Sequence, residues 1–153
     1  MPIVIRADDP SATPARELIL AHLTEMAGFS PPESVHALGI QALSDPSVRF
    51  WSAFVDGELA GIGALKLVDE ERGEIKSMRV ADAFRGSGIG RRMLRHIVSE
   101  ASARGLTSLW LETGSTPEFH PAQRLYRSEG FVPCEPFGDY APDPFSLFYT
   151  RTL

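Results

Sequence analysis

The chain has little cysteine, no asparagine and no long apolar run among its 153 residues. The single cysteine, Cys134, cannot form an intrachain disulfide or a thiolate metal site, which predicts a reducing compartment, the cytoplasm. No apolar run approaches the roughly 20 residues that a membrane-spanning helix needs, so no membrane partner is expected. The N-terminus has neither a basic start nor a small-residue cleavage site, and it does not resemble a signal peptide.

Positive charge is also scarce, because 15 Lys and Arg stand against 20 Asp and Glu, a formal net charge of −5. Nucleic-acid affinity comes largely from clustered Lys and Arg, so no nucleic-acid partner is expected. The histidines His22, His36 and His96 lack metal-ligand spacing with one another or with Asp and Glu, which predicts no catalytic metal. The length, the 43% apolar content and the absence of linkers predict one domain over residues 1–153.

Alternating apolar patterns predict strands at 3–7, 106–112 and 146–150, and a hairpin of strands 49–55 and 58–68 around Asp56-Gly57. The run 74–80 extends that hairpin to three antiparallel strands. Helical spacing predicts helices at 14–28, 88–104 and 121–129. The capping-box spacing of Ser30 and Glu33 predicts another helix, which continues through Val35, Leu38, Ile40 and Leu43. This order of elements predicts an α/β sandwich with a mixed sheet.

The most informative segment is a glycine-rich turn between the strand ending near Val80 and an amphipathic helix; it consists of Arg85, Gly86, Ser87, Gly88, Ile89, Gly90 and Arg91. Glycines allow close approach of a ligand to the backbone, and a helix N-terminus carries about half a positive charge, so the turn suits a pyrophosphate. It lacks the Gly-Lys-Ser/Thr ending of a Walker loop. It also lacks the last glycine of the dinucleotide fingerprint, where Arg91 stands.

The turn resembles the coenzyme A loop of the GNAT superfamily of N-acyltransferases, whose pattern of Gln or Arg, two residues, Gly, one residue, and Gly or Ala is filled by Arg85, Gly88 and Gly90. A second family signature, a tyrosine-bearing helix followed by Gly-Phe, is matched by Ala122, Leu125, Tyr126, Gly130 and Phe131. The resemblance covers the chain from Ile3 to Leu153. It implies a GNAT-like α/β fold with a mixed, mostly antiparallel sheet flanked by helices.

The same resemblance implies the chemistry: direct transfer of an acetyl group from acetyl-CoA to an amine of a small molecule or amino acid. Strand 74–80 resembles the family strand whose edge pairs with the pantetheine arm, here through the backbone of Met78 and Val80, with the Met78 N–H as oxyanion donor. Tyr126 resembles the tyrosine that donates to the coenzyme A sulfur; as an alternative it is a core tyrosine. Many members place an asparagine after the fifth strand, and Thr113 or Ser115 replaces it here unless that contact is absent.

The general base is predicted at Glu74, which begins the cofactor strand as the base does in some family members. Glu74, Lys76 and Met78 lie two residues apart and are expected on one strand face, where the first two form either a substrate clamp or an ion pair. Glu112 and His120 are alternative bases or substrate-contacting residues. The aromatic and acidic loop 135–140 either lines the acceptor pocket or is an ordinary lid.

Three further interpretations of the sequence stay open. The first is a catalytically silent sensor that binds acyl-CoA without turnover, and the second is an N-acetyltransferase that acts on proteins or peptides. The third is a nucleotide-binding protein, which would bind ATP rather than coenzyme A at the glycine turn. The sequence also leaves a homodimer open.

Overall fold

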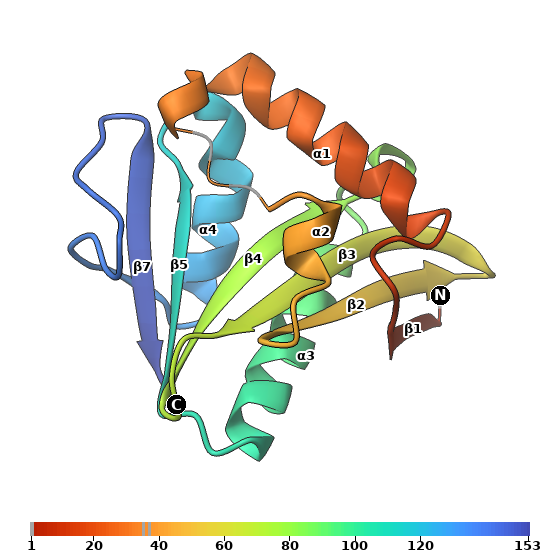
Figure 1. Cartoon of the computed structure of the whole chain (residues 1–153). Helices are drawn as coiled ribbons and strands as arrows, with labels where there is room; N and C mark the ends of the chain where they lie inside the picture. The colour runs from red at the N-terminus through yellow and green to blue at the C-terminus, as the bar shows by residue number, and fades with distance from the viewer. Residues whose placement is uncertain (1, 35, 37) are drawn as a thin grey trace.

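The computed structural model describes residues 2–34, 36 and 38–153. One sheet contains all the strands, with helices and short 3₁₀ turns between them (Figure 1). In chain order the elements are β1 (Ile3–Ala7), α1 (Ala15–Phe29), η1 (Pro32–Ser34), α2 (Ile40–Leu43), β2 (Val48–Val55), β3 (Glu58–Leu67), β4 (Arg72–Val80), η2 (Asp82–Phe84), α3 (Ile89–Ala103), β5 (Ser108–Gly114), η3 (Pro117–Phe119), α4 (His120–Ser128), β6 (Val132–Pro133) and β7 (Ser146–Thr152).

The sheet is mixed and mostly antiparallel, as expected. Its strand order is β1-β2-β3-β4-β5-β7-β6, and β4 with β5 is the parallel pair. The predicted hairpin forms β2 and β3, with Asp56 and Gly57 at positive φ in the turn, and β4 continues the meander. None of the helices in the described ranges is long and apolar enough to cross a membrane.

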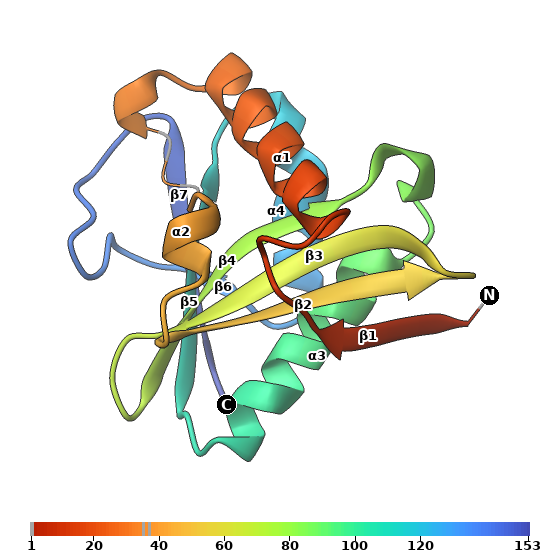
Figure 2. The same cartoon turned by 45° about the vertical axis from the view of Figure 1, so that its right-hand side comes forward.

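Helices cover both faces of the sheet (Figures 1 and 2). Alternate residues of β2 and β3 point to opposite faces, and they form two apolar clusters. The larger cluster lies under α3 and α4, where Gly63 lets α3 pack closely, because a Cβ there would lie 2.7 Å from Met93. The smaller cluster lies under α1 and α2 and includes Ile19 and Leu43.

The continuous second helix predicted from Ser30 to Leu43 is wrong. The described part of this segment holds only the 3₁₀ turn η1 and the four-residue helix α2, and the predicted Val35 lies outside the described residues. Contacts with distant segments explain the break. The Ser34 hydroxyl donates to Asp143 at 2.6 Å, and the His36 carbonyl accepts from Lys76 Nζ at 3.1 Å.

Strands β4 and β5 separate along their length, and this positions the site. They pair only over 72–74 and 108–110, after which they diverge in Figure 1. The edge of β4 that faces β5 is therefore not covered by β5 from Ile75 onward. The turn 85–91 follows the open half of β4, so a ligand at the helix start can also reach this strand edge.

Candidate active site

The glycine turn presents a row of unpaired backbone donors. Gly86 and Gly88 have φ of 77° and 85°, and Gly88 is the N-cap of α3 in the left-handed conformation. Five N–H groups, those of Gly86, Gly88, Ile89, Gly90 and Arg91, donate no hydrogen bond to the described residues. A Cβ at Gly86 or Gly88 would meet nothing within 4 Å, so the turn is not packed against other parts of the chain at these two positions. This geometry fits an anionic group such as a pyrophosphate.

The arginines of the turn are held by carboxylates. Arg85, which is half exposed, contacts Asp82 at 2.9 Å and Glu25 of α1 at 3.3 Å. Glu25 also contacts Arg79 of β4 at 2.5 Å, and the hydrogen bond from Arg79 lowers the pKa of Glu25. Arg91 pairs with Glu129 at 2.6 Å. These ion pairs fix the turn to α1, β4 and the end of α4, while direct phosphate contacts of Arg85 and Arg91 stay a prediction.

A β-bulge interrupts β4 beside the separation of the strands. Lys76 pairs with Ala64 but Arg79 pairs with Ile62, so three steps on β4 match two on β3, and Ser77 has a φ of 55°. The expectation that Met78 shares a face with Glu74 and Lys76 is therefore wrong. The bulge turns Met78, like Val80, toward the larger cluster under α3 and α4. Their backbone contacts with a pantetheine arm stay a prediction.

Glu74 and Lys76 lie in a buried polar cluster on the α1 and α2 side of the sheet. Glu74 is 6% exposed, and its Oε2 accepts from the Tyr140 hydroxyl at 2.6 Å and from Lys76 Nζ at 3.2 Å. Lys76 Nζ also donates to the Tyr140 hydroxyl at 2.8 Å. The ion pair between Glu74 and Lys76 is therefore buried and not exposed to solvent.

Glu112 belongs to the same side of the sheet, and His120 does not join it. Glu112 Oε2 accepts from the Ser146 hydroxyl at 2.7 Å. Burial raises the pKa of Glu112, the Ser146 hydrogen bond opposes this, and the charges of Glu74 and Lys76 act on it too. His120 is exposed at the first residue of α4. As alternative bases, Glu112 is thus placed near Glu74, whereas His120 faces solvent.

Tyr126 lies on α4, on the face of the sheet opposite to Glu74 and Lys76. It is 8% exposed and packs against the rings of Phe131 and Tyr149. Burial, and to a lesser degree the charge of Glu112, raises the pKa of Tyr126 to about 12. The hydroxyls of Tyr140 and Tyr149 are hydrogen-bonded, whereas that of Tyr126 has no partner among the residues described by the structure. It is a protonated, unengaged donor at neutral pH.

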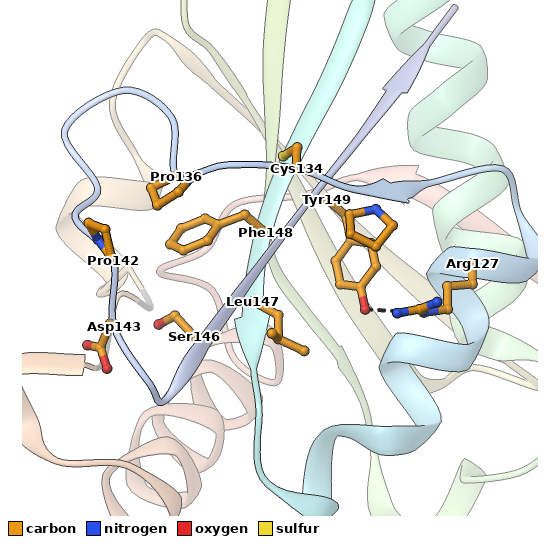
Figure 3. Close-up of a pocket in the computed structure, with 10 residues that line it drawn as sticks. Arg127, Cys134, Pro136, Pro142, Asp143, Ser146, Leu147, Phe148 and Tyr149 are labelled. Atoms are coloured by element: carbon orange, nitrogen blue, oxygen red, sulfur yellow. Dashed lines mark hydrogen bonds between the residues drawn. The ribbon is translucent and has the colours of Figure 1, made fainter.

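The proline-rich loop before β7 closes the cluster from outside. Phe137 and Tyr140 of this loop contact each other, and both contact Phe148 of β7. Beside the loop, a cavity of about 270 Å³ opens along β7, with Arg127 donating to the Tyr149 hydroxyl at 3.4 Å in its wall (Figure 3). Ser146 and Phe148 line this cavity and also contact the cluster, so the cavity and the cluster are adjacent along β7.

Several contacts of this site carry no signal in the sequence. Tyr140 stands in a loop that the sequence marks only as a pocket wall or a lid, and its bonds to Glu74 and Lys76 span 66 and 64 residues. Glu25 and Arg79 are joined by a contact between α1 and β4. Two residues are predicted to replace the missing asparagine. The Ser115 hydroxyl donates to the Pro144 carbonyl at 2.6 Å, and Thr113 is buried.

Comparison with known proteins gives one consistent result. The model of the acetyltransferase (GNAT) family matches residues 16–131. The uncharacterised N-acetyltransferase YsnE of Bacillus subtilis is 48% identical over 149 residues, which cover 97% of this chain and 99% of that protein. A Klebsiella pneumoniae protein proposed to be an acyl-CoA N-acyltransferase superimposes with a TM-score of 0.80 at 28% identity, covering 99% and 97% of the two chains.

A GNAT family acetyltransferase of Elizabethkingia anophelis, whose crystal structure contains acetyl-CoA, superimposes with a TM-score of 0.72. Its identity to this chain is 21%, and 99% of this chain and 98% of that chain are covered. The likeness to the Elizabethkingia anophelis protein concerns the fold alone.

Proposed function

Because the chain belongs to the GNAT family of acetyltransferases, we propose that it transfers the acetyl group of acetyl-CoA directly to the amine of a small molecule. The observation that carries the proposal is the row of unpaired N–H groups at the start of α3, which follows the open half of β4. This arrangement suits a ligand with a pyrophosphate at one end and an extended arm along a strand edge. The likeness to an acetyl-CoA-bound fold agrees with it.

Acetyl-CoA supplies the thioester carbonyl: the amine nitrogen bonds to its carbon, and the carbon–sulfur bond breaks. The residues of the chain bind acetyl-CoA and position the groups that react. The N–H groups of Gly88, Ile89 and Gly90 hold the pyrophosphate. The Met78 N–H stabilises negative charge on the thioester oxygen. Since the bulge at Ser77 redirects the strand at this point, it positions that donor without a dedicated side chain.

Glu74 removes the proton of the amine. Its Oε2 is engaged by Tyr140 and Lys76, but Oε1 accepts no hydrogen bond from the described residues. A carboxylate held on one oxygen and free on the other is fixed in orientation and able to take a proton. Glu112, half-buried on the neighbouring strand, is the second candidate for this role.

Tyr126 stabilises the departing sulfur by a hydrogen bond. A phenol with a pKa of about 12 remains protonated at neutral pH. An ordinary thiol has a pKa of about 8.5, so full transfer of the phenolic proton to the thiolate is unfavourable. An acceptor that enters as an ammonium gives one proton to Glu74. The second proton, which the nitrogen loses as the amide forms, completes the free thiol, so the reaction needs no net proton from the protein.

The test is thiol release from acetyl-CoA with a panel of amines, amino acids and peptides, combined with calorimetric titration of acetyl-CoA. The proposal expects saturable binding and thiol release that depends on an amine. Binding without release for any acceptor supports the sensor instead. Release that depends on peptides alone supports a protein N-acetyltransferase, and protection by ATP in place of coenzyme A contradicts the proposal.

A further inference from the structure

The ammonium of Lys76 has no donor left for a substrate. Its three N–H groups have three acceptors within the protein: the His36 carbonyl at 3.1 Å, Glu74 Oε2 at 3.2 Å and the Tyr140 hydroxyl at 2.8 Å. The side chain is 9% exposed. Lys76 therefore ties β4 to the segment before α2 and to the loop before β7, and the cation nearest to Glu74 is already fully hydrogen-bonded.

The acceptors that remain in the cluster are carboxylate oxygens. Oε1 of Glu74 and Oε1 of Glu112 accept no hydrogen bond from the part of the chain that the structure describes, whereas each Oε2 is engaged. Asp143 adds a third carboxylate nearby, since its charge acts on both Glu112 and His36. Burial, and then the charge of Lys76, lowers the pKa of His36, so this imidazole is neutral at neutral pH.

Aromatic rings line the same cluster. Tyr140 lies 4.9 Å from the His36 ring and 5.4 Å from the Phe148 ring, and its own ring centroid is 5.5 Å from Lys76 Nζ. Phe137 lies 5.4 Å from Trp110, the β5 partner of Glu74. Aromatic faces attract cations and apolar bodies, and they offer nothing to a carboxylate.

We propose that the acceptor site selects amines without a carboxylate beside the reacting nitrogen, and so disfavours α-amino acids. This inference rests on the proposed function. An ammonium entering the cluster meets the free oxygens of Glu74 and Glu112. A carboxylate entering with it meets like charges, and Lys76, the cation nearest to Glu74, is already fully hydrogen-bonded. Uncompensated like charges at a partly buried site are costly, so the discrimination in kcat/KM is at least about tenfold.

Matched series of acceptors separate charge from size. Each series has an amine, the amino acid with the same skeleton and the amide of that amino acid, for example tryptamine, tryptophan and tryptophan amide. The amide keeps the added volume but removes the negative charge. The inference expects amine and amide to exceed the amino acid by at least about tenfold in kcat/KM. An amide as poor as the amino acid means that size decides, which overturns the inference.

Two variants test the residues behind this preference. Glu112→Gln removes one like charge, so it should narrow the gap between amide and amino acid to about threefold or less while the Kd of acetyl-CoA stays unchanged. Lys76→Met should lower kcat/KM for all acceptors alike, because Lys76 orders Tyr140 and the segment before α2. A selective loss with amino acids would show that Lys76 binds a substrate carboxylate, and this result overturns the inference.

Failure of the inference and failure of the proposed function look different. The acceptor series is measured with the wild-type protein, so its result does not depend on whether a variant folds. If amino acids react as well as their amines, the inference is overturned while the proposed function stands. If acetyl-CoA does not bind, or binds but no member of any series reacts, the proposed function fails, and the inference falls with it.

Discussion

Removal of the Tyr126 hydroxyl isolates the role of this residue, because the hydroxyl has no hydrogen-bond partner in the described structure. The ring of Tyr126→Phe keeps its packing against Phe131 and Tyr149. The free energy of unfolding should therefore change by less than about 1 kcal/mol. If the hydroxyl stabilises the departing sulfur, the loss appears in the transition state only, and the affinity for acetyl-CoA is retained.

The magnitude follows from the strength of a hydrogen bond to a charged group. Such a bond contributes about 1.5–3 kcal/mol, and each 1.36 kcal/mol changes a rate about tenfold, so kcat should fall roughly 10- to 150-fold. Since the pKa of Tyr126 is about 12, the hydroxyl is protonated throughout the neutral range and the loss should not vary with pH there. The assay is single-turnover thiol release, in which the chemical step is observed directly.

The matched control is Tyr149→Phe, which removes a phenol from the same aromatic group. Tyr149 is 1% exposed and its hydroxyl accepts from Arg127, away from the proposed reaction. This variant should lose stability and keep its kcat. An unchanged single-turnover rate in Tyr126→Phe, or equal losses in both variants, would refute the role of Tyr126.

Three further predictions concern cofactor binding, the base and acid stability. Gly88→Val and its control Gly57→Val both place a branched side chain at a positive φ (85° and 81°), where an added Cβ has no neighbour within 4 Å. Both variants should therefore lose stability. Only Gly88→Val should abolish acetyl-CoA binding in a calorimetric titration. Glu74→Gln should lower kcat/KM and remove the acidic limb of its pH profile; a limb that persists transfers the role to Glu112. Burial, and then the charge of Arg79, lowers the pKa of His22 from 6.5 to about 4. Between pH 6.5 and 4 the unfolded state therefore binds more protons at this residue than the folded state does. The free energy of unfolding of the wild type should fall by about 3 kcal/mol as the pH drops over this range. His22→Leu should lack this loss in urea titrations, and a parallel loss in the variant would show that other groups cause it.

The parts of the fold that depend on local patterns could be predicted from the sequence. Asp56-Gly57 marks the hairpin, and the apolar spacing of 88–104 marks α3, which spans Ile89–Ala103 in the structure. These signals succeed because turn geometry and amphipathic spacing are decided within a few residues. The family resemblance rests on the same local features.

The parts that depend on distant contacts could not be predicted. The capping-box residues Ser30 and Glu33 favour a helix locally. The hydrogen bond from Ser34 to Asp143 spans 109 residues, and the segment that makes it does not continue as a helix. The bulge at Ser77 moves Met78 to the other face, although the alternation of residue types gives no sign of it. Tyr140 reaches Glu74 because the loop before β7 folds back over the sheet.

The central claim is that the open edge of β4 and the start of α3 serve acetyl transfer to an amine. The most direct test measures free coenzyme A thiol and N-acetylated amine in the same reaction, with an amine that lacks a carboxylate. We expect one acetylated amine for each thiol released, and the loss of both products in Gly88→Val. Acetyl-CoA that binds to the wild-type protein and stays intact with every amine would contradict the account.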